Sequence, residues 1–232
     1  TGNGGFDFYC ALMSLPRLLG ISSETIPDPF VLRVSKDIRK HTMARIEMPQ
    51  DSRLNVGVVW SGSVTFADNR NRSVGVGRFL DLAARLENCR FFSLQKGPPV
   101  AELHALSGGL LIRDLSPELD DFAMTAAVLE KLDLVVMTDS SVVHVAGSMG
   151  VPVLDLLQFK PYWLYMPERP TTPWYPSVRF LRQEEPGNWS PVFRQAEEIL
   201  ALLAEKKRSQ RGLKGEEVLE IADWKIPLMP CR

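Results

Sequence analysis

The sequence has few cysteines and no long apolar run. Its three cysteines, Cys10, Cys89 and Cys231, are far apart, odd in number and without the spacing of a metal site. This usage indicates a reduced compartment, so we expect a cytoplasmic protein without a metal site. No apolar run approaches the roughly 18–20 residues that a membrane span needs, so no span is expected.

The beginning of the chain also lacks two common features. The stretch TGNGGFDFYC contains no basic segment followed by an apolar block, and it has no initiator methionine. A leader peptide is therefore not expected. The missing methionine suggests that the chain is a fragment of a longer protein.

Net charge is nearly absent, at -1 over 232 residues. Such a balance predicts no bulk attraction to nucleic acid or to an anionic membrane. Any anion that binds must therefore be held by local groups. The contents of 45% hydrophobic and 24% charged residues are ordinary for a soluble globular protein. The length fits one large domain, or one and a half small ones.

The centre of the chain alternates short apolar runs with helical patterns. Strands that are buried on both faces lose their polar alternation, so these runs favour a parallel sheet. The strand candidates are 54–60, 89–95, 110–115, 132–138 and 151–157, and the helix candidates lie at about 77–87, 99–106, 118–131 and 141–149. This rhythm predicts a Rossmann-like, doubly wound α/β domain.

The two ends of the sequence follow other patterns. Residues 1–53 mix turns and prolines, and we interpret them as a linker or the end of a preceding domain. The nucleotide-binding domain is expected over 54–204, with a last strand near 178–183 and a final helix from about residue 190. Residues 205–232 are predicted to be a tail that begins as a solvated charge run.

The stretch TDSSVVHVAGSMGVPV (138–153) carries the first candidate site. Asp139, Ser140 and Ser141 would lie at the carboxyl end of a strand, where open α/β sheets bind their ligands. A helix that begins there offers free N–H groups suited to phosphate. With Ser141 as N-cap, His144 would lie on the first turn and could reach the same ligand.

Polar residues follow two other predicted strands. The loop 61–77 is long for a strand-to-helix connection, and it contains Arg72 and Ser73, which can pair with an anion. Gln95 and Lys96 come at the end of the next strand; the amide could pair with a base or sugar, and the ammonium with phosphate.

Each of these features also has an ordinary structural explanation. Serines commonly cap helices, a histidine in an apolar segment can be structural, and loop arginines or a lone lysine can be solvated. Gly147 is expected to allow the close approach of another backbone or a ligand. Three polar strand ends that converge on one crevice favour a ligand site more strongly than any one of them.

Six segments occur in an order that resembles a known family: VGVVWSGS, NRNRSV, FFSLQKG, DFAMTAAVLEKLDLVVMTDSSVVHVAGSMGVPVLDLL, PWYPSVRFLRQ and NWSPVF. They resemble the C-terminal, donor-binding half of bacterial glycosyltransferases that are often fused to tetratricopeptide repeats. These enzymes are related to the heptosyltransferases of glycosyltransferase family 9 and, more distantly, to the O-linked N-acetylglucosamine transferase and SPINDLY group. The resemblance covers about residues 55–203, and residues 14–28 resemble the segment that links the two halves.

The resemblance implies half of a GT-B fold that binds a nucleotide-diphosphate sugar as donor, with no metal or other cofactor, for inverting transfer. Gln95 and Lys96 would contact the nucleotide and its diphosphate, and Arg72 and Ser73 would face the diphosphate. The phosphate and sugar would meet the strand end and helix start, at Asp139, Ser140, Ser141 and His144. In a reaction without a metal, such donors must stabilise the charge of the leaving diphosphate.

The resemblance also implies partners. A GT-B enzyme places its acceptor, a protein or a glycan, largely on an N-terminal half, which residues 1–53 are too few to supply. We therefore expect an N-terminal glycosyltransferase half or a repeat domain as partner, and the catalytic residue is left unassigned.

The sequence departs from the family pattern at three places, one of which is RSVGVG (72–77), where RSIPL is usual. Met124 stands where an acidic residue is common, and residues 161–165 lack an acid and an arginine. These departures support a second hypothesis, a degenerate module that binds or scaffolds without transfer activity. A third, a dinucleotide-dependent oxidoreductase, is disfavoured because G-x-G-x-x-G does not follow the first strand.

Overall fold

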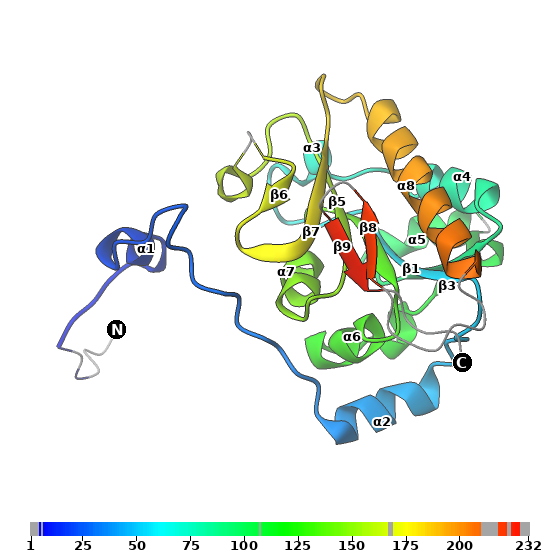
Figure 1. The fold of residues 1–232 in the computed structure, drawn as a ribbon, viewed down its shortest axis with the longest axis horizontal. Helices are drawn as coiled ribbons and strands as arrows, with labels where there is room; N and C mark the ends of the chain where they lie inside the picture. The colour runs from blue at the N-terminus through cyan, green and yellow to red at the C-terminus, as the bar shows by residue number, and fades with distance from the viewer. Residues whose placement is uncertain are drawn as a thin grey trace.

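The computed structural model describes residue 5 and residues 7–106, 108–166, 169–209, 218–221 and 224–227. Its centre is a seven-stranded sheet with the order β3-β2-β1-β4-β5-β7-β6, covered by helices on both faces (Figure 1). The strands are β1 (Leu54–Val59), β2 (Cys89–Ser93), β3 (Ile112–Asp114), β4 (Leu134–Thr138), β5 (Val153–Leu157), β6 (Thr171–Thr172) and β7 (Tyr175–Arg182).

The topology confirms the predicted doubly wound α/β fold. Neighbouring strands are parallel except for β6 and β7, which are antiparallel. Because β1 lies between β2 and β4, the strand order reverses at β1, and the carboxyl ends of β1 and β4 flank the switch point where such sheets bind ligands. The five strands predicted within residues 54–157 are all present, each with ends within a few residues of the prediction.

Two apolar cores lie on opposite faces of the sheet. The covering helices are α4 (Gly77–Arg85), α5 (Val100–Ala105) and α8 (Ser190–Ser209) on one face, and α6 (Phe122–Leu129) and α7 (Ser141–Ser148) on the other. Alternate residues of one strand enter different cores, as Leu134 and Val135 of β4 do. This two-sided burial explains why the strands appear in the sequence as continuous apolar runs.

Shorter elements complete the described chain: η1 (Leu12–Ser14), α1 (Leu15–Leu18), α3 (Asn69–Arg72), η2 (Gly108–Leu110), η3 (Ser116–Glu118), η4 (Trp163–Tyr165) and an antiparallel pair, β8 (Val218–Ile221) with β9 (Trp224–Pro227). The helix predicted from residue 118 begins instead at Phe122, because η3 precedes it and the Asp121 carboxylate caps it by accepting from Met124 N–H (2.8 Å).

The first 53 residues contribute to the domain through a helix, α2 (Lys36–Arg45), that packs against α6. Arg39 forms an ion pair with Glu130 at 2.6 Å, and Ile46 lies in the core beside α6 and α7. By contrast, η1 and α1 lie apart from the sheet and its helices in Figure 1. The segment interpreted from sequence as a linker therefore contains one helix that is part of the packed body.

The end of α8 corrects the prediction that a solvated charge run begins near residue 205. Lys207 is only 1% exposed, and its ammonium donates to Asp133 Oδ2 at 2.7 Å. The same carboxylate oxygen accepts from Asn55 N–H at 2.7 Å, at the start of β1. The pair thus joins α8 to the amino ends of β1 and β4. Cys89, the first residue of β2, is buried too, and its burial raises the pKa of its thiol to about 12.

Gly147, in the C-terminal half of α7, allows a close approach, as predicted from the sequence. The group that approaches it is a side chain, whereas a backbone or a ligand was expected. A Cβ at Gly147 would lie 2.5 Å from Tyr175 Cγ, so the glycine makes room for a tyrosine of β7. Tyr175 in turn lies beside His144, with ring centroids 5.8 Å apart. Gly150 then ends the helix at φ +73°, with Val151 N–H donating to Ala146 O at 2.9 Å.

Replacing Lys207 should destabilise the fold strongly. In Lys207→Met, Asp133 keeps its burial but loses its counter-ion, and such a loss costs about 3–5 kcal/mol. Arg85→Met is the control, because it breaks an exposed pair with Glu197 (3.2 Å), where a change within about 1 kcal/mol is expected. Urea unfolding at pH 7 measures both variants. Equal losses would show that Asp133 does not need Lys207.

Candidate functional site

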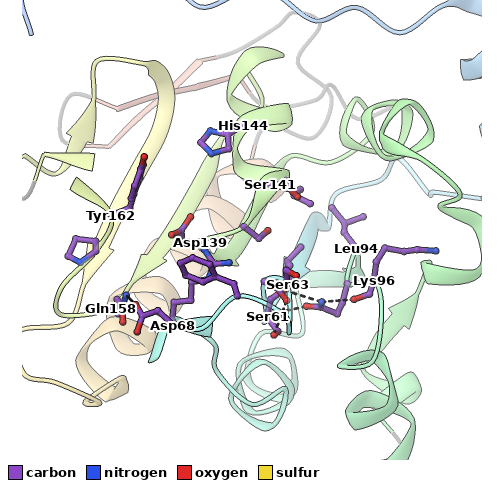
Figure 2. Close-up of a pocket in the computed structure, with 18 of the residues that line it drawn as sticks. Ser61, Ser63, Asp68, Leu94, Lys96, Asp139, Ser141, His144, Gln158 and Tyr162 are labelled. Carbon is purple, nitrogen blue, oxygen red and sulfur yellow. Dashed lines mark hydrogen bonds and ion pairs between the residues drawn. The ribbon is translucent and has the colours of Figure 1, made fainter. Parts of the chain in front are cut away.

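A cavity of about 700 Å³ opens at the carboxyl ends of the strands (Figure 2). Seven of the eight residues predicted for the site line it: Arg72, Gln95, Lys96, Asp139, Ser140, Ser141 and His144. Ser73 does not line the cavity. Its hydroxyl shares a hydrogen bond of 3.0 Å with the hydroxyl of Ser61, and Ser61 does line the cavity. The three polar strand ends found in the sequence therefore converge.

The amino end of α7 faces this cavity without a side-chain cap. The helix begins at Ser141, so the N-cap is Ser140 and not Ser141 as predicted. The Ser140 hydroxyl makes no capping bond and has no hydrogen-bond partner among the described residues. Val143 N–H donates to Ser140 O at 3.1 Å, so the amides before it, those of Ser141 and Val142, are the ones available to an anion in the cavity.

His144 lies on the same helix with its imidazole at the cavity wall. Desolvation by the surrounding protein lowers the pKa of His144, while the nearby Asp139 carboxylate opposes that shift. At neutral pH the ring is therefore neutral and can donate one hydrogen bond and accept another. This state suits a polar contact with a ligand better than the pairing of charges.

Asp139 is held from two sides. The Tyr165 hydroxyl donates to Oδ1 at 2.7 Å, and Arg72 Nη1 lies 3.4 Å from Oδ2. The Arg72 guanidinium also covers the Phe66 ring, 4.4 Å from its centroid. Arg72 therefore lines the cavity as the partner of a carboxylate, whereas the sequence suggested a cation that faces the diphosphate.

Gln95 is buried and fully hydrogen-bonded within the chain. Its carboxamide oxygen accepts from Trp60 N–H (3.0 Å) and Ser61 N–H (2.9 Å). Its amide nitrogen donates to Ser61 O (3.1 Å) and Lys96 O (2.9 Å). Both donors of the amide are used, so the structure gives Gln95 the role of joining the ends of β1 and β2 in place of the expected contact with a base or sugar.

Lys96 is exposed, and its ammonium donates to Ser116 O at 2.7 Å. Figure 2 shows its side chain extending away from Asp139 and Ser141. A flexible lysine that gives up one exposed hydrogen bond can turn toward an anion in the cavity. The structure therefore brings Lys96 to the edge of the site, with its charge directed outward.

Sequence reasoning missed several lining residues. Gln158 follows β5 and donates to Asp68 Oδ2 at 2.7 Å, which closes one side of the cavity (Figure 2). This bond and a second one from Asn71 lower the pKa of Asp68. In the sequence, Tyr165 stands out only as part of a departure from a family pattern. Its role depends on how the segment after β5 folds back, which no local pattern reports.

Met124, whose identity raised the possibility of a degenerate site, is buried on α6 and is not among the residues that line the cavity. Among the described residues, no group of three or more histidine, cysteine, aspartate or glutamate side chains could hold a metal ion. Within the same part of the chain, no helix has the length and apolar character required to span a membrane.

Comparisons with known proteins bear on the fold. No protein-family model matches the chain. The ADP-heptose LPS heptosyltransferase II of E. coli is similar in structure, with a TM-score of 0.57 and 17% identity over 79% of this chain and 57% of that one. A glycosyltransferase of family 9 from Veillonella parvula gives a TM-score of 0.52 and 16% identity, over 85% of this chain and 58% of that one.

One curated protein is similar in part of its sequence. Protein FlbA of Caulobacter vibrioides is 35% identical over 79 residues, which are 34% of this chain and 12% of that protein. The chain thus spans well under two thirds of the proteins it resembles. What it shares with the two solved glycosyltransferases is the Rossmann-like α/β fold.

Proposed function

We propose that the cavity binds a nucleotide-diphosphate sugar and that the chain is the donor-binding, C-terminal half of a GT-B glycosyltransferase of the repeat-linked type. The observation that carries this proposal is the uncapped start of α7, which faces a cavity at the carboxyl ends of the strands. Free amides and the positive end of the helix dipole favour a phosphate there. The cavity volume of about 700 Å³ is within the range of small-molecule sites.

The proposed reaction is an inverting transfer in which the leaving diphosphate is stabilised by the chain's own groups. The amides of α7 supply donors at the point where charge develops, and Lys96 supplies a cation that can turn in from the edge. Ser141 and the neutral His144 add polar contacts. A similar structure is named for ADP-heptose, so adenosine diphosphate is the first nucleotide to test.

The general base and the acceptor, a protein or a glycan, are proposed to come from another domain. Both lining carboxylates already accept hydrogen bonds, Asp68 from Gln158 and Asn71, and Asp139 from Tyr165 and Arg72. These bonds hold both carboxylates in place, and neither is assigned as the general base. The similar solved structures are also longer, since the chain covers 57% and 58% of them.

A charge reversal at the start of α7 tests the proposed phosphate contact. Ser141→Asp places a carboxylate beside the helix amides, so affinity for ADP, UDP or GDP should fall at least about tenfold through like-charge repulsion. The thermal midpoint should hold or rise, because an acid at this end of a helix is favourable. Isothermal titration calorimetry measures the affinities.

Ser190→Asp is the matched control, because Ser190 is the first residue of α8 and does not line the cavity. It should leave nucleotide affinity unchanged. If the wild-type chain binds none of the three diphosphates, or if both variants behave alike, the proposed phosphate contact is wrong. Nucleotide binding without turnover of any nucleotide sugar by the complete protein would instead support the degenerate binding module.

Lys96 provides a second test. In Lys96→Ala, nucleoside diphosphate affinity should fall about three- to tenfold, because a mobile cation near the cavity is lost. Lys40→Ala, on the exposed side of α2, is the control for a change in total charge. Calorimetry at low and at high salt should show the loss shrinking as salt screens the charge. Unchanged affinity at low salt would mean that Lys96 stays on Ser116.

A further inference from the structure

Behind the cavity wall lies a carboxyl group that the proposed function does not use. Asp155 in β5 is 0% exposed, and neither of its carboxyl oxygens has a hydrogen-bond partner among the described residues. It pairs in register with Met137 of β4 and Phe180 of β7, so it lies inside the sheet between these two strands, and its charge interacts with that of Asp139. A buried carboxylate without hydrogen bonds is very costly, so the group is expected to be neutral.

The charged groups around Asp155 support this state. Burial raises the pKa of Asp155 well above its ordinary value, and the neighbouring Asp139 carboxylate raises it further. Arg182 of β7 and Arg72 of α3 act in the opposite direction. Asp139 is the more exposed of the two, and it carries the hydrogen bonds.

Arg182 is directed to the segment that follows β5 and not to Asp155. Its Nη2 lies 2.8 Å from Tyr165 O, 3.2 Å from Met166 O and 3.1 Å from Arg169 O, and its two protons are shared among these three carbonyl groups. Met166 has φ +46°, a left-handed conformation that is unfavourable for a residue with a side chain. Three hydrogen bonds from one guanidinium hold this turn on the sheet.

Tyr165 links that turn to the cavity. It is 4% exposed, its ring packs against Phe180 with centroids 5.0 Å apart, and its hydroxyl donates to Asp139 Oδ1 at 2.7 Å. A continuous set of contacts therefore runs from Arg182 through the backbone of the turn and Tyr165 to the carboxylate that lines the cavity.

We propose that Asp155, Arg182 and Tyr165 are positioning residues that fix the Asp139 carboxylate as an anionic acceptor for sugar hydroxyls. This inference rests on the proposed function. Each carboxylate oxygen can accept two hydrogen bonds, and the protein supplies one to each, so one position on each oxygen remains for neighbouring hydroxyls. A carboxylate repels phosphate, so the sugar lies against Asp139 and the diphosphate against the start of α7.

The neutral state of Asp155 is part of this arrangement. Arg182 Nε and Nη1 are buried and have no hydrogen-bond partner among the described residues. An ionised Asp155 would attract them and compete with the three carbonyl groups of the turn. The protonated carboxyl leaves the guanidinium on the turn, and Tyr165 stays on Asp139.

The first experiment separates sugar binding from nucleotide binding. Calorimetry compares each diphosphate with a matching sugar: ADP with ADP-glucose, UDP with UDP-N-acetylglucosamine, and GDP with GDP-mannose. The measurements are made on the wild type, on Tyr165→Phe and on Tyr9→Phe. Tyr9→Phe is the control, because Tyr9 is 94% exposed. Tyr165→Phe should weaken the nucleotide sugar that binds best by about fivefold or more, through loss of a charge-assisted hydrogen bond. The matching nucleoside diphosphate should bind to Tyr165→Phe with the affinity that it has for the wild type.

Equal losses for the sugar and the diphosphate, or no loss for either, would overturn the positioning role while leaving the proposed function intact. If the wild type binds no nucleotide at all, the proposed function fails, and a test without ligand decides the positioning. With ¹³C-labelled aspartate, Tyr165→Phe should shift the carboxyl resonance of Asp139 and leave that of Asp81, exposed on α4, in place. An unmoved Asp139 resonance would overturn the proposal.

The second experiment follows stability against pH. A carboxyl whose pKa is raised by folding holds its proton longer in the folded state, so it costs stability as pH rises above the unfolded value of about 4. Asp155→Asn removes this cost, and its free energy of unfolding relative to wild type should therefore increase between pH 5 and pH 8. Asp81→Asn should show no such trend. A constant difference for Asp155→Asn would mean that Asp155 is already ionised at pH 5 and would refute its neutral role.

Discussion

Burial of the central strands on both faces is the constraint on which the rest of the structure depends. Every residue of β1, β4 and β5 is buried, so these strands have no face on which a polar side chain can meet water. Polar side chains reach solvent only beyond the strand ends, and beyond the carboxyl ends they line one cavity. Helix α7 begins at the same edge because it follows β4 directly. The position of the site is thus a consequence of how the sheet is covered.

Two carboxyl groups lie inside this apolar framework, and the chain accommodates them in different ways. Asp133, just before β4, is ionic and shares its charge with Lys207 and the amide of Asn55. Asp155, inside β5, has no such partner among the described residues, and the guanidinium of Arg182 is directed to backbone carbonyl groups. The paired charge of Asp133 joins α8 to the amino edge of the sheet. A neutral acid under the cavity adds no second negative charge near the site where an anion is proposed to bind.

The sequence predicted the features that depend on local patterns. Apolar runs identified β1, β2, β3, β4 and β5, and the polar residues after them identified the edge where the cavity lies. The sequence-based predictions were wrong where a side chain bonds to a residue far away along the chain. Lys207 appeared solvated because its neighbours in sequence are charged, yet its partner is 74 residues away. Gln95 appeared free because a sequence does not reveal that its side chain bonds to the backbone of Trp60 and Ser61, 35 and 34 residues earlier.

The charges of the cavity also follow a division that residue types alone do not reveal. Arg72 is tied to Asp139 and Phe66, so its charge balances a carboxylate of the protein before any ligand arrives. If Arg72 served a diphosphate instead, Asp139 would be left with only the Tyr165 hydroxyl, beside a second anion. The proposed function separates the two roles: Arg72 and Tyr165 would hold Asp139 toward hydroxyl groups, and the amides of α7 with Lys96 would be left for phosphate.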